Sequence, residues 1–433
     1  MLATVGVSTV EELFRDIPAG VRLGRPLDLE PPLAEQEIVA HLDQLASQNE
    51  HAGKELSFLG AGIYDHYVPA VVNTVLSRGE FLTAYTPYQP EMSQGVLQAI
   101  FEYQTAICEL TGMDVSNASG YDGTTVAADA CYLARYVTGR SRVVVTEATN
   151  PQVRQVVKTY APGFGLEVVE VPHSGGTTDP EQVAEAAQGA AAVIFQQPNF
   201  FGCLEPAPEL AAAAAEADAL PVAHVDPVSL GVLEAPARYG CAIAIGEGQG
   251  AGNAMSFGGP HYGFIASRLE HIRRMPGRIV GETTDLAGER GYVLTLSTRE
   301  QHIRREKATS NITTNQTLLA LGGLVYLSWL GPQGLRELGE TCMALSSYAR
   351  SELEAAGFEI VFSNKATFKE FAVRVGRPAG DVIRDARKHG VHPGYRLGRD
   401  YAGLDDCLLV AVTEKRRKAD IDRLVEVLSE VGR

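Results

Sequence analysis

The residues that can do chemistry lie in three polar or glycine-rich turns of this 433-residue chain. The first turn, Asn117–Thr125, leads into a helical stretch, where backbone N–H groups favour an anion such as phosphate. Asp122, however, puts a negative charge where a phosphate would sit. Because small polar residues also cap most helices, this turn predicts either a phosphate cup or an ordinary helix cap.

The second and third turns offer one acidic residue and a run of glycines. Asp226, in His224–Pro227, can pair with a protonated ring nitrogen, or it can simply start a turn before proline. Gly246–Asn253 has spaced glycines, as dinucleotide-binding loops do. That fingerprint belongs near the first strand of its fold, whereas this run follows the fifth strand-like segment, so we reject a dinucleotide site.

Motifs and charge exclude several other kinds of site and partner. There is no HExxH, GxSxG or P-loop motif, and the six cysteines form no CxxC pair, which argues against a zinc site and a disulfide framework. The net charge of −16 and the single short basic run, 415–418, argue against nucleic acid. No uninterrupted apolar run approaches the roughly 20 residues that span a bilayer. Because the start also lacks a signal-peptide pattern, we expect a cytoplasmic protein without a membrane partner.

Lysine is scarce and unevenly placed. The chain has eight lysines against twenty-nine arginines, and none lies between Lys158 and Lys307. An enzyme that holds an aldehyde cofactor through an imine needs a lysine amine. The central part of the chain offers no residue for such a bond.

Alternating strand-like and helical stretches must position these turns. From 61 to 315 the pattern predicts a large α/β domain, with a mostly parallel sheet covered by helices on both faces. Residues 95–112 predict one amphipathic helix, and Asn150 and Asp179, each followed by proline, predict two helix starts. The strand-like runs are 142–148, 166–172, 191–197, 221–226, 241–246 and 262–267.

The two ends of the chain differ from this α/β part. Residues 1–60 predict a helical N-terminal arm, which packs either across a neighbouring subunit or on its own core. Residues 316–433 predict a small α+β domain that starts with a long helical region broken at Gly331. Its strand-like runs are 358–362, 368–375 and 407–412, and its later helices are expected near 380–389 and 418–431.

Several longer segments resemble the P-protein of the glycine cleavage system. They are Tyr85–Gly95, Phe101–Thr105, Asn117–Ser119, Gly258–His261, Arg273–Arg278 and, as the longest, Thr298–Ile312. The resemblance covers essentially the whole chain. It is to the amino-terminal half of the single-chain form, which is the α subunit where the protein is split in two. It implies an aspartate-aminotransferase-like α/β fold, that of type I pyridoxal-phosphate enzymes.

The resemblance also implies that this chain has only a vestigial cofactor site of its own. In the family's carboxy-terminal half, a lysine eleven residues before the proline of a Gly-Gly-Pro turn binds the cofactor covalently. Counting back from Pro260, that position is Gln249. A carboxamide nitrogen is not a usable nucleophile, and no lysine close in sequence can replace it. The positions that match the ring-nitrogen partner and the emptied phosphate cup are Asp226 and, for the cup, Ser119, Gly123 and Thr124.

By the same resemblance, the chemistry takes place on a β subunit that holds pyridoxal phosphate, while this chain binds no cofactor covalently. Glycine loses carbon dioxide there, and its aminomethyl group passes to the lipoyl arm of H-protein. We expect this chain to be the non-catalytic α subunit of such a glycine decarboxylase. The expected assembly is α2β2.

Two parts of the chain are expected to reach the partner's site. Thr309, Ser310 and Asn311 match a loop that contacts the partner's cofactor, with Arg304 and Arg305 nearby as charge partners. An ordinary helix cap is the alternative for this loop. Tyr85, Tyr88 and Glu91 are expected to line the entrance for the lipoyl arm, although aromatic residues in such turns are often part of the core.

Two other functions remain open from the sequence. The chain could be a pure scaffold that stabilises the β subunit or docks H-protein. It could also be an independent pyridoxal-phosphate lyase or transferase, which conflicts with the missing lysine. Alanine substitutions in the 309–311 loop separate the scaffold from a shared active site, and borohydride labelling would reveal a hidden attachment lysine.

Overall fold

The computed structural model describes residues 1–308, 312 and 314–432, and these fall into two compact units, Met1–Lys54 and Glu55–Arg433. The first unit contains α1 (Leu2–Val5), two 3-10 turns (Glu11–Phe14 and Ala19–Val21) and α2 (Glu35–Ala46). Only α2 is longer than one turn, so the predicted arm is less helical than expected. Prolines throughout this stretch explain the difference, because proline interrupts helical hydrogen bonding.

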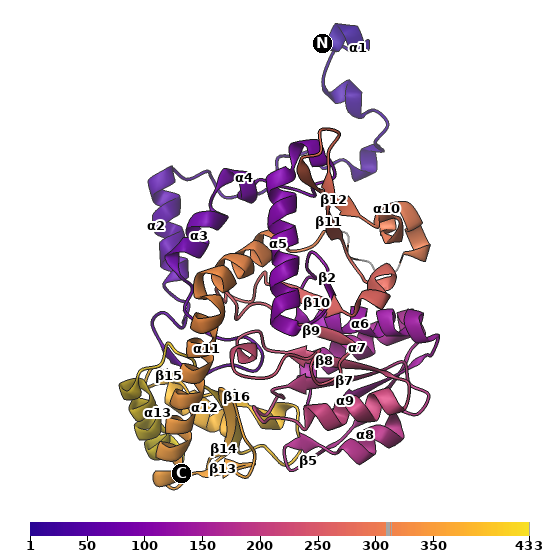
Figure 1. Ribbon diagram of the computed structural model, residues 1–433. Helices are drawn as coiled ribbons and strands as arrows, with labels where there is room; N and C mark the ends of the chain where they lie inside the picture. The colour runs from indigo at the N-terminus through magenta and orange to yellow at the C-terminus, as the bar shows by residue number, and fades with distance from the viewer. Residues whose placement is uncertain (309–311, 313, 433) are drawn as a thin grey trace. The chain divides into compact units, whose positions relative to one another are not determined.

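A seven-stranded sheet forms the centre of the second unit, in the order β2-β10-β9-β8-β7-β3-β4 (Figure 1). The strands β9, β8, β7, β3 and β4 run parallel, and β10 is antiparallel to both of its neighbours. The bounds are β2 Val115–Ser116, β3 Arg142–Thr146, β4 Glu167–Val171, β7 Ala192–Gln197, β8 Leu220–Val225, β9 Ile243–Glu247 and β10 Gly263–Ser267. All six predicted strand-like runs are therefore strands of this sheet.

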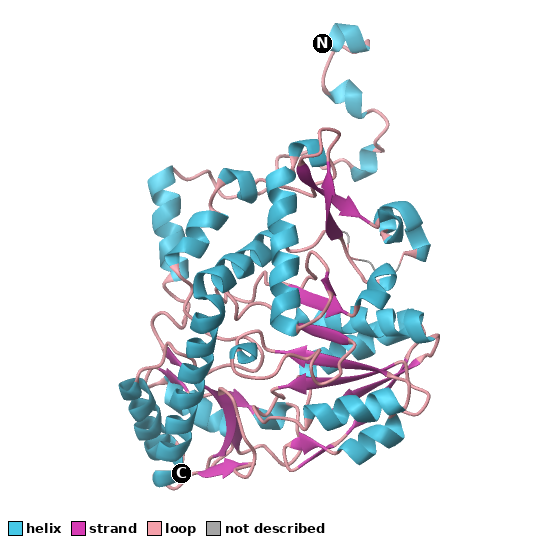
Figure 2. Cartoon of the chain, in the orientation of Figure 1, coloured by secondary structure: helices cyan, strands magenta, loops and turns pink. Residues whose placement is uncertain are grey.

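Helices cover both faces of this sheet, as strands that are apolar on both faces require. Figure 2 shows these helices in cyan around the magenta strands. The bounds of the covering helices are α5 Gln94–Thr111, α6 Gly123–Thr138, α7 Pro151–Phe164, α8 Pro180–Ala186 and α9 Ala207–Glu216. The preceding helices α3 (Ala70–Leu76) and α4 (Gly79–Leu82) pack against each other. Asn150 and Asp179 cap α7 and α8 with their side chains, as the sequence predicts.

A four-stranded antiparallel sheet, in the order β13-β14-β17-β16, lies in the C-terminal part. Its strands are β13 Glu359–Val361, β14 Glu370–Arg374, β16 Tyr395–Arg396 and β17 Cys407–Ala411, and its helices are α12 Ala379–Arg387 and α13 Lys418–Val431. The two sheets fall inside the predicted domains 61–315 and 316–433, although residues 55–433 form one compact unit.

The long helix α11 (Thr317–Ala355) runs from beside α5 to the four-stranded sheet and α13 (Figure 1). It kinks at Gly331, whose φ of 62° lies outside the helical range, as the predicted break requires. Among the described residues, α11 alone is long and apolar enough to cross a membrane by length and composition. Core helices pass the same test, and α11 packs Tyr326 and Cys342 into the core.

The remaining elements are short or were not expected. β11 (Ile279–Thr284) and β12 (Arg290–Thr295) form a hairpin that the sequence analysis does not predict. Two small pairs join β1 (Leu56–Ser57) to β15 (Val391–His392) and β5 (His173–Ser174) to β6 (Thr177–Thr178). The short α10 (Gln301–Arg304) precedes the undescribed residues 309–311.

Candidate functional site

Gln249 lies just beyond the end of β9 and is 1% exposed. Its side-chain oxygen accepts a hydrogen bond from the Tyr64 backbone N–H at 2.8 Å. Its side-chain nitrogen donates to the backbone oxygens of Tyr64 and Asn253, at 2.9 and 2.8 Å. Both amide hydrogens are therefore used, and the group that replaces the expected lysine is fixed by the backbone around it.

The N-terminus of α6 lies at the same end of the sheet. Asp122 caps the helix by accepting from the backbone N–H groups of Thr124 and Thr125, both at 2.8 Å. The Glu247 carboxyl group accepts from the backbone N–H of Gly123 at 2.8 Å and from that of Gln249 at 2.9 Å. The first three N–H groups of α6, which would otherwise bind an anion, are thus satisfied by carboxyl groups of the chain itself.

Burial strongly affects the acid–base behaviour of Glu247. The surrounding protein raises the pKa of this carboxyl group to about 8, mainly by desolvation, although the backbone N–H groups of Gly123 and Gln249 act to lower it. Because the Glu247 carboxyl group binds a proton readily and accepts two backbone hydrogen bonds, it needs no cation from outside the chain. A phosphate dianion could not use the Gly123 N–H group, because the Glu247 carboxyl group already accepts from it.

Asp226 is also engaged by the chain itself. One carboxylate oxygen accepts from the Val228 backbone N–H at 2.9 Å, and the other lies 2.6 Å from the Lys369 ammonium. Lys369 precedes β14 of the four-stranded sheet and is only 2% exposed. Lys369 lies outside the lysine-free stretch between Lys158 and Lys307 and reaches this site from a distant segment. This lysine reaches the ring-nitrogen end, not the aldehyde end.

Lys369 was missed because it lies far from Asp226 in the sequence. A signal for it does exist within the predicted strand 368–375. Lys369 and Glu370 are consecutive charged residues there, so one points to each face, and both are buried. Two consecutive buried charges in a strand indicate specific partners rather than a solvated face.

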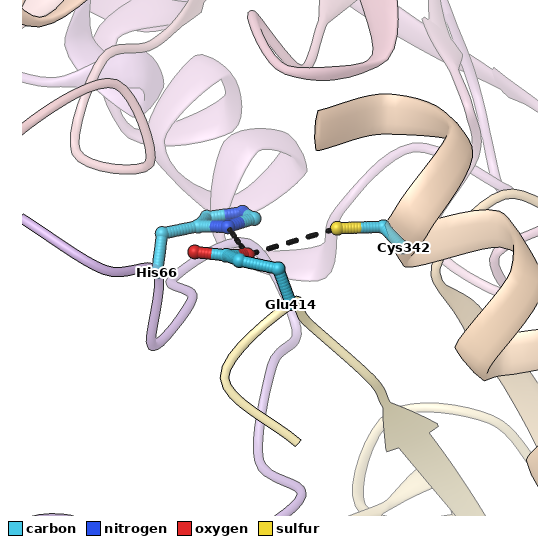
Figure 3. Close-up of side chains that lie close together, drawn as sticks. All are labelled: His66, Cys342 and Glu414. Carbon is cyan, nitrogen blue, oxygen red and sulfur yellow. Dashed lines mark hydrogen bonds and ion pairs between the residues drawn. The ribbon is translucent and has the colours of Figure 1, made fainter. Parts of the chain in front are cut away.

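His66 and Cys342, which are buried, and Glu414, which is half-buried, lie close together (Figure 3). His66 also lies next to Lys369. One ligand atom from each of His66, Cys342 and Glu414 lies within 4.8 Å of the other two, which is compatible with a metal site. His66 Nδ1 is 2.7 Å from Glu414, and the Cys342 thiol is 3.7 Å from the same carboxylate. The Lys369 ammonium donates to His66 Nε2 at 2.9 Å.

The tautomer of His66 decides between a metal and a hydrogen-bonded group. An ammonium has only donors, so Nε2 must accept and Nδ1 must carry the proton. Nδ1 therefore donates to Glu414 and has no lone pair for a metal. Burial also raises the pKa of the Cys342 thiol to about 12, which disfavours the thiolate that binds metals. The residues fit a hydrogen-bonded group better than a metal centre.

Pyridoxal phosphate does not fit this set of residues. Its aldehyde would meet the amide of Gln249, its ring nitrogen would meet an Asp226 already paired with Lys369, and its phosphate would meet Glu247. A cavity of about 650 Å³ remains beside these groups, with His224 and Thr124 in its lining. Desolvation lowers the pKa of His224 to about 4, so its imidazole is neutral.

Ser119 has different partners from the rest of the predicted phosphate cup. Its hydroxyl accepts from the side-chain nitrogen of Asn315 at 2.8 Å and from the backbone N–H of Gln316 at 3.1 Å. It therefore anchors the segment that follows the 309–311 loop. Thr309, Ser310 and Asn311 themselves lie outside the described residues.

The residues predicted for the lipoyl entrance are on the surface. Tyr85 is 76% exposed, lies 3.4 Å from the Thr314 hydroxyl and lines a cavity of about 160 Å³ with Asn315 and Thr317. Tyr88 is half-exposed and Glu91 is exposed in the 3-10 turn Pro90–Met92. Tyr85 therefore shares a cavity with the residues that directly follow the 309–311 loop.

Tyr88 is the acceptor for a buried arginine. Arg278 donates from Nη2 to the Tyr88 hydroxyl at 2.8 Å, and its Nε lies 3.5 Å from Glu300. Among the described residues, Nη1 of this guanidinium has no hydrogen-bond partner, and neither does one oxygen of Glu300. The edge of the His302 ring packs against the Tyr88 ring.

Comparison with known proteins matches the whole chain to one family. The family model described as "Glycine cleavage system P-protein" matches residues 1–428. The chain is 52% identical over 429 residues to the "Probable glycine dehydrogenase (decarboxylating) subunit 1" of Carboxydothermus hydrogenoformans, which covers 99% of this chain and 96% of that protein. A protein of the same name from Moorella thermoacetica is 51% identical over 430 residues, again covering 99% and 96%.

Solved structures agree with this match. A crystal structure of glycine decarboxylase (P-protein) of the glycine cleavage system, in inhibitor-bound form, superimposes with a TM-score of 0.94 at 44% identity, covering 100% of this chain and 97% of that one. An alanine–glyoxylate aminotransferase from Nostoc sp. superimposes with a TM-score of 0.62 at 16% identity, covering 94% and 98%. The second similarity shows the fold alone, which is the predicted aminotransferase-like one.

Proposed function

We propose that this chain, which belongs to the glycine cleavage system P-protein family, is the non-catalytic subunit of a two-subunit glycine decarboxylase. The observation that carries the proposal is the buried Gln249 at the position of the cofactor lysine, with its amide bonded to backbone on both sides. An amide cannot hold an aldehyde cofactor, so this chain needs a second one to decarboxylate glycine.

The second chain would carry pyridoxal phosphate and the attachment lysine. The relatives of this chain are named subunit 1, which supports a separate subunit 2. The bound cofactor supplies the electron sink for the loss of carbon dioxide. The aminomethyl group would pass to the lipoyl arm of H-protein, within an α2β2 assembly in the cytoplasm.

This chain would contribute one wall of the partner's active site. Thr309, Ser310 and Asn311 offer two hydroxyls and an amide, which suit a phosphate. Tyr85, Tyr88 and Glu91 would line the path of the lipoyl arm. The surface position of Tyr85, beside Thr314 and Asn315, supports a shared site, since these residues directly follow the loop.

The experiment compares the full chain alone, the partner alone and the two expressed together. Borohydride reduction followed by peptide mass spectrometry locates any lysine that carries the cofactor, and exchange of labelled bicarbonate into glycine measures activity. We expect labelling only on a peptide of the partner, and full exchange only when both chains are present. Labelling on a lysine of this chain, or exchange by this chain alone, would falsify the proposal.

The engagement of Gln249, Asp226 and Glu247 by groups of the chain itself also favours a second candidate, a scaffold that adds no group to the partner's site. A T309A/S310A/N311A variant separates the two functions. A shared site predicts an intact complex with turnover lowered by about tenfold or more, the usual loss for a phosphate or transition-state contact. A scaffold predicts unchanged turnover. The matched control is T159A/S351A/N364A, which changes exposed residues of the same three types.

A further inference from the structure

Lys369 is unusual because its charge is almost completely removed from water. The side chain is 2% exposed, and a buried ammonium is very unfavourable unless all of its donors are used. Here the Asp226 carboxylate lies at 2.6 Å, His66 Nε2 lies at 2.9 Å, and the Tyr64 ring centroid lies at 3.5 Å. One anion, one neutral acceptor and one aromatic face therefore surround this nitrogen.

The position of the ammonium is the position that a pyridinium would need. Asp226 has one oxygen bound to the Val228 backbone N–H, which leaves the other oxygen for a cationic donor. A pyridinium ring has a single N–H, and it would have to use this second oxygen. Lys369 and a cofactor ring cannot both occupy it.

The same ammonium joins parts of the chain that are distant in sequence. Asp226 follows β8 of the seven-stranded sheet, Lys369 precedes β14 of the four-stranded sheet, and His66 lies in the segment between β1 and α3. Glu370, the next residue, accepts from the Ala61 backbone N–H and the Tyr64 hydroxyl, both at 2.7 Å. The contacts of Lys369 and Glu370 thus close the pocket from the C-terminal side.

The cavity of about 650 Å³ is lined by Gly123, Thr124 and Glu247, and Lys369 is not part of its lining. Near Glu370 the chain is packed tightly. Gly202 has a φ of 79°, and a Cβ atom there would lie 2.0 Å from the backbone oxygen of Glu370. The segment after β7 therefore touches the start of β14 backbone to backbone.

Lys369 is not a displaced attachment lysine. In pyridoxal phosphate the aldehyde and the ring nitrogen lie at opposite ends of the ring, and Asp226 marks the nitrogen end. The Lys369 nitrogen is also already engaged by Asp226 and by His66 Nε2. The geometry therefore points to Lys369 as the counter-ion of the Asp226 carboxylate.

We propose that Lys369 is a built-in replacement for the cofactor ring: its ammonium neutralises Asp226 and closes this chain's own pocket to pyridine-based ligands. The inference concerns this chain's own pocket and does not depend on where the partner holds its cofactor. It assigns a role to a lysine that no family motif quoted above contains.

A double-mutant cycle on the full-length chain tests the charge balance. K369M leaves Asp226 buried and unpaired, and D226N leaves Lys369 unpaired, so each single variant should lower the Tm by about 4 °C or fail to fold. K369M/D226N removes both charges and should recover at least half of the larger loss. The control is the exposed pair Arg78 and Glu80, 2.7 Å apart, whose single variants R78M and E80Q should each change the Tm by no more than about 1 °C.

Two results would overturn the proposal. The first is additive losses in K369M/D226N, or a double variant that fails to fold while D226N folds, because Lys369 would then not act through Asp226. The second comes from wild-type chain titrated with pyridoxine 5′-phosphate, which lacks the aldehyde and so cannot label surface lysines. We expect no saturable binding. Binding that D226N weakens tenfold would show an open pocket.

Discussion

The pocket around Gln249 and the surface around Tyr85 differ in how their polar groups are satisfied. In the pocket, Gln249, Asp226 and Glu247 each bind donors or acceptors of the chain itself. At the surface, Tyr85 is exposed, and the buried Arg278 keeps two nitrogens, Nε and Nη1, without a hydrogen-bond partner among the described residues. The three named groups of the pocket are engaged within the chain, although both ring nitrogens of the neighbouring His224 lack a hydrogen-bond partner among the described residues. At the surface, groups of both Arg278 and Glu300 lack such partners.

This difference indicates how a duplicated enzyme fold can lose one active site and keep another. Removing a cofactor leaves a buried anion partner and an uncapped helix N-terminus, both of which are unfavourable. Lys369 and Glu247 supply the missing groups from within the chain. Under the proposed function, the surface around Tyr85 is the part of the chain that can still act on the partner's site.

The largest effect is expected from opening the closed pocket at Glu370. E370A removes the acceptor of the Ala61 N–H and of the Tyr64 hydroxyl and leaves a cavity. We expect the free energy of unfolding to fall by about 3–4 kcal/mol in urea denaturation. E359A on the neighbouring strand, where Glu359 pairs with Arg374 at the surface, should cost less than about 1 kcal/mol. Equal losses of unfolding free energy in E370A and E359A would mean that the contacts of Glu370 stabilise the chain no more than a surface ion pair does.

Glu247 should give the pocket a characteristic pH dependence. Its folded-state pKa of about 8 lies above the ordinary value of 4.5, so the folded chain binds this proton more tightly than the unfolded chain. The resulting stability is present below pH 4.5 and is lost as the pH rises to about 8. We expect the stability of wild type relative to E247Q to fall by on the order of 3 kcal/mol over this range. A flat difference between pH 5 and 8 would contradict the assignment.

Restoring the lysine should not restore the site. Q249K removes the acceptor of the buried Tyr64 N–H, which should cost about 2 kcal/mol of stability. The variant should show no imine absorption with pyridoxal phosphate, because Lys369 and Glu247 still fill the ring and phosphate positions. Q333K, on the exposed face of α11, controls for adding a lysine. An imine at residue 249, mapped by borohydride labelling, would show that the pocket is merely inactive and not closed.

The surface around Tyr85 should respond in activity and not in stability. Y88F removes the acceptor for Arg278 Nη2, so the third nitrogen of this buried guanidinium also loses its hydrogen-bond partner. We expect turnover of the two-chain complex to fall about fivefold to tenfold, corresponding to about 1 kcal/mol, with little change in Tm. Y67F changes another exposed tyrosine and should leave turnover unchanged. An equal loss in Y67F would mean that the effect is not local to Tyr88.

Local patterns in the sequence predict much of the fold. The strands β3, β4, β7, β8, β9 and β10 are continuous apolar runs with clear breaks, and the caps at Asn150 and Asp179 are recognisable from two residues each. The β11–β12 hairpin was missed because its outer residues are exposed and polar, which weakens the alternation. The limits of the predicted domains remain predictions, since the compact units divide the chain only after Lys54.

Some residues of the candidate site could be predicted from the sequence, whereas others could not, because they come from distant segments of the chain. Gln249 and Asp226 follow from motifs close to them in sequence, so counting residues finds them. Lys369 and His66 reach the site from other segments, and only the packing of the two sheets brings them to Asp226 and Glu414. Glu247 lies inside a recognised glycine run, but its role depends on the unrelated helix start at Gly123. Long-range pairs of this kind carry no local signal.

The smallest effect is expected at His66, Cys342 and Glu414, because this group is complete without a metal. Lys369 donates to Nε2 of His66, which puts the proton on Nδ1 and directs it to Glu414. Burial acts to raise the pKa of Glu414, but the hydrogen bonds from His66 and from the Tyr67 backbone N–H lower it to about 2. The Glu414 carboxylate is therefore ionised and accepts the hydrogen bond from His66 Nδ1. Chelation of divalent metals should therefore leave the Tm unchanged, and C342S should cost less than about 1.5 kcal/mol, because the serine hydroxyl can donate to the same carboxylate. The contrary result would be a bound metal, found by elemental analysis, that is lost in C342S together with several degrees of Tm. It would require the opposite tautomer of His66 and an uncharged Lys369. It would therefore contradict the proposal that Lys369 closes the adjoining pocket.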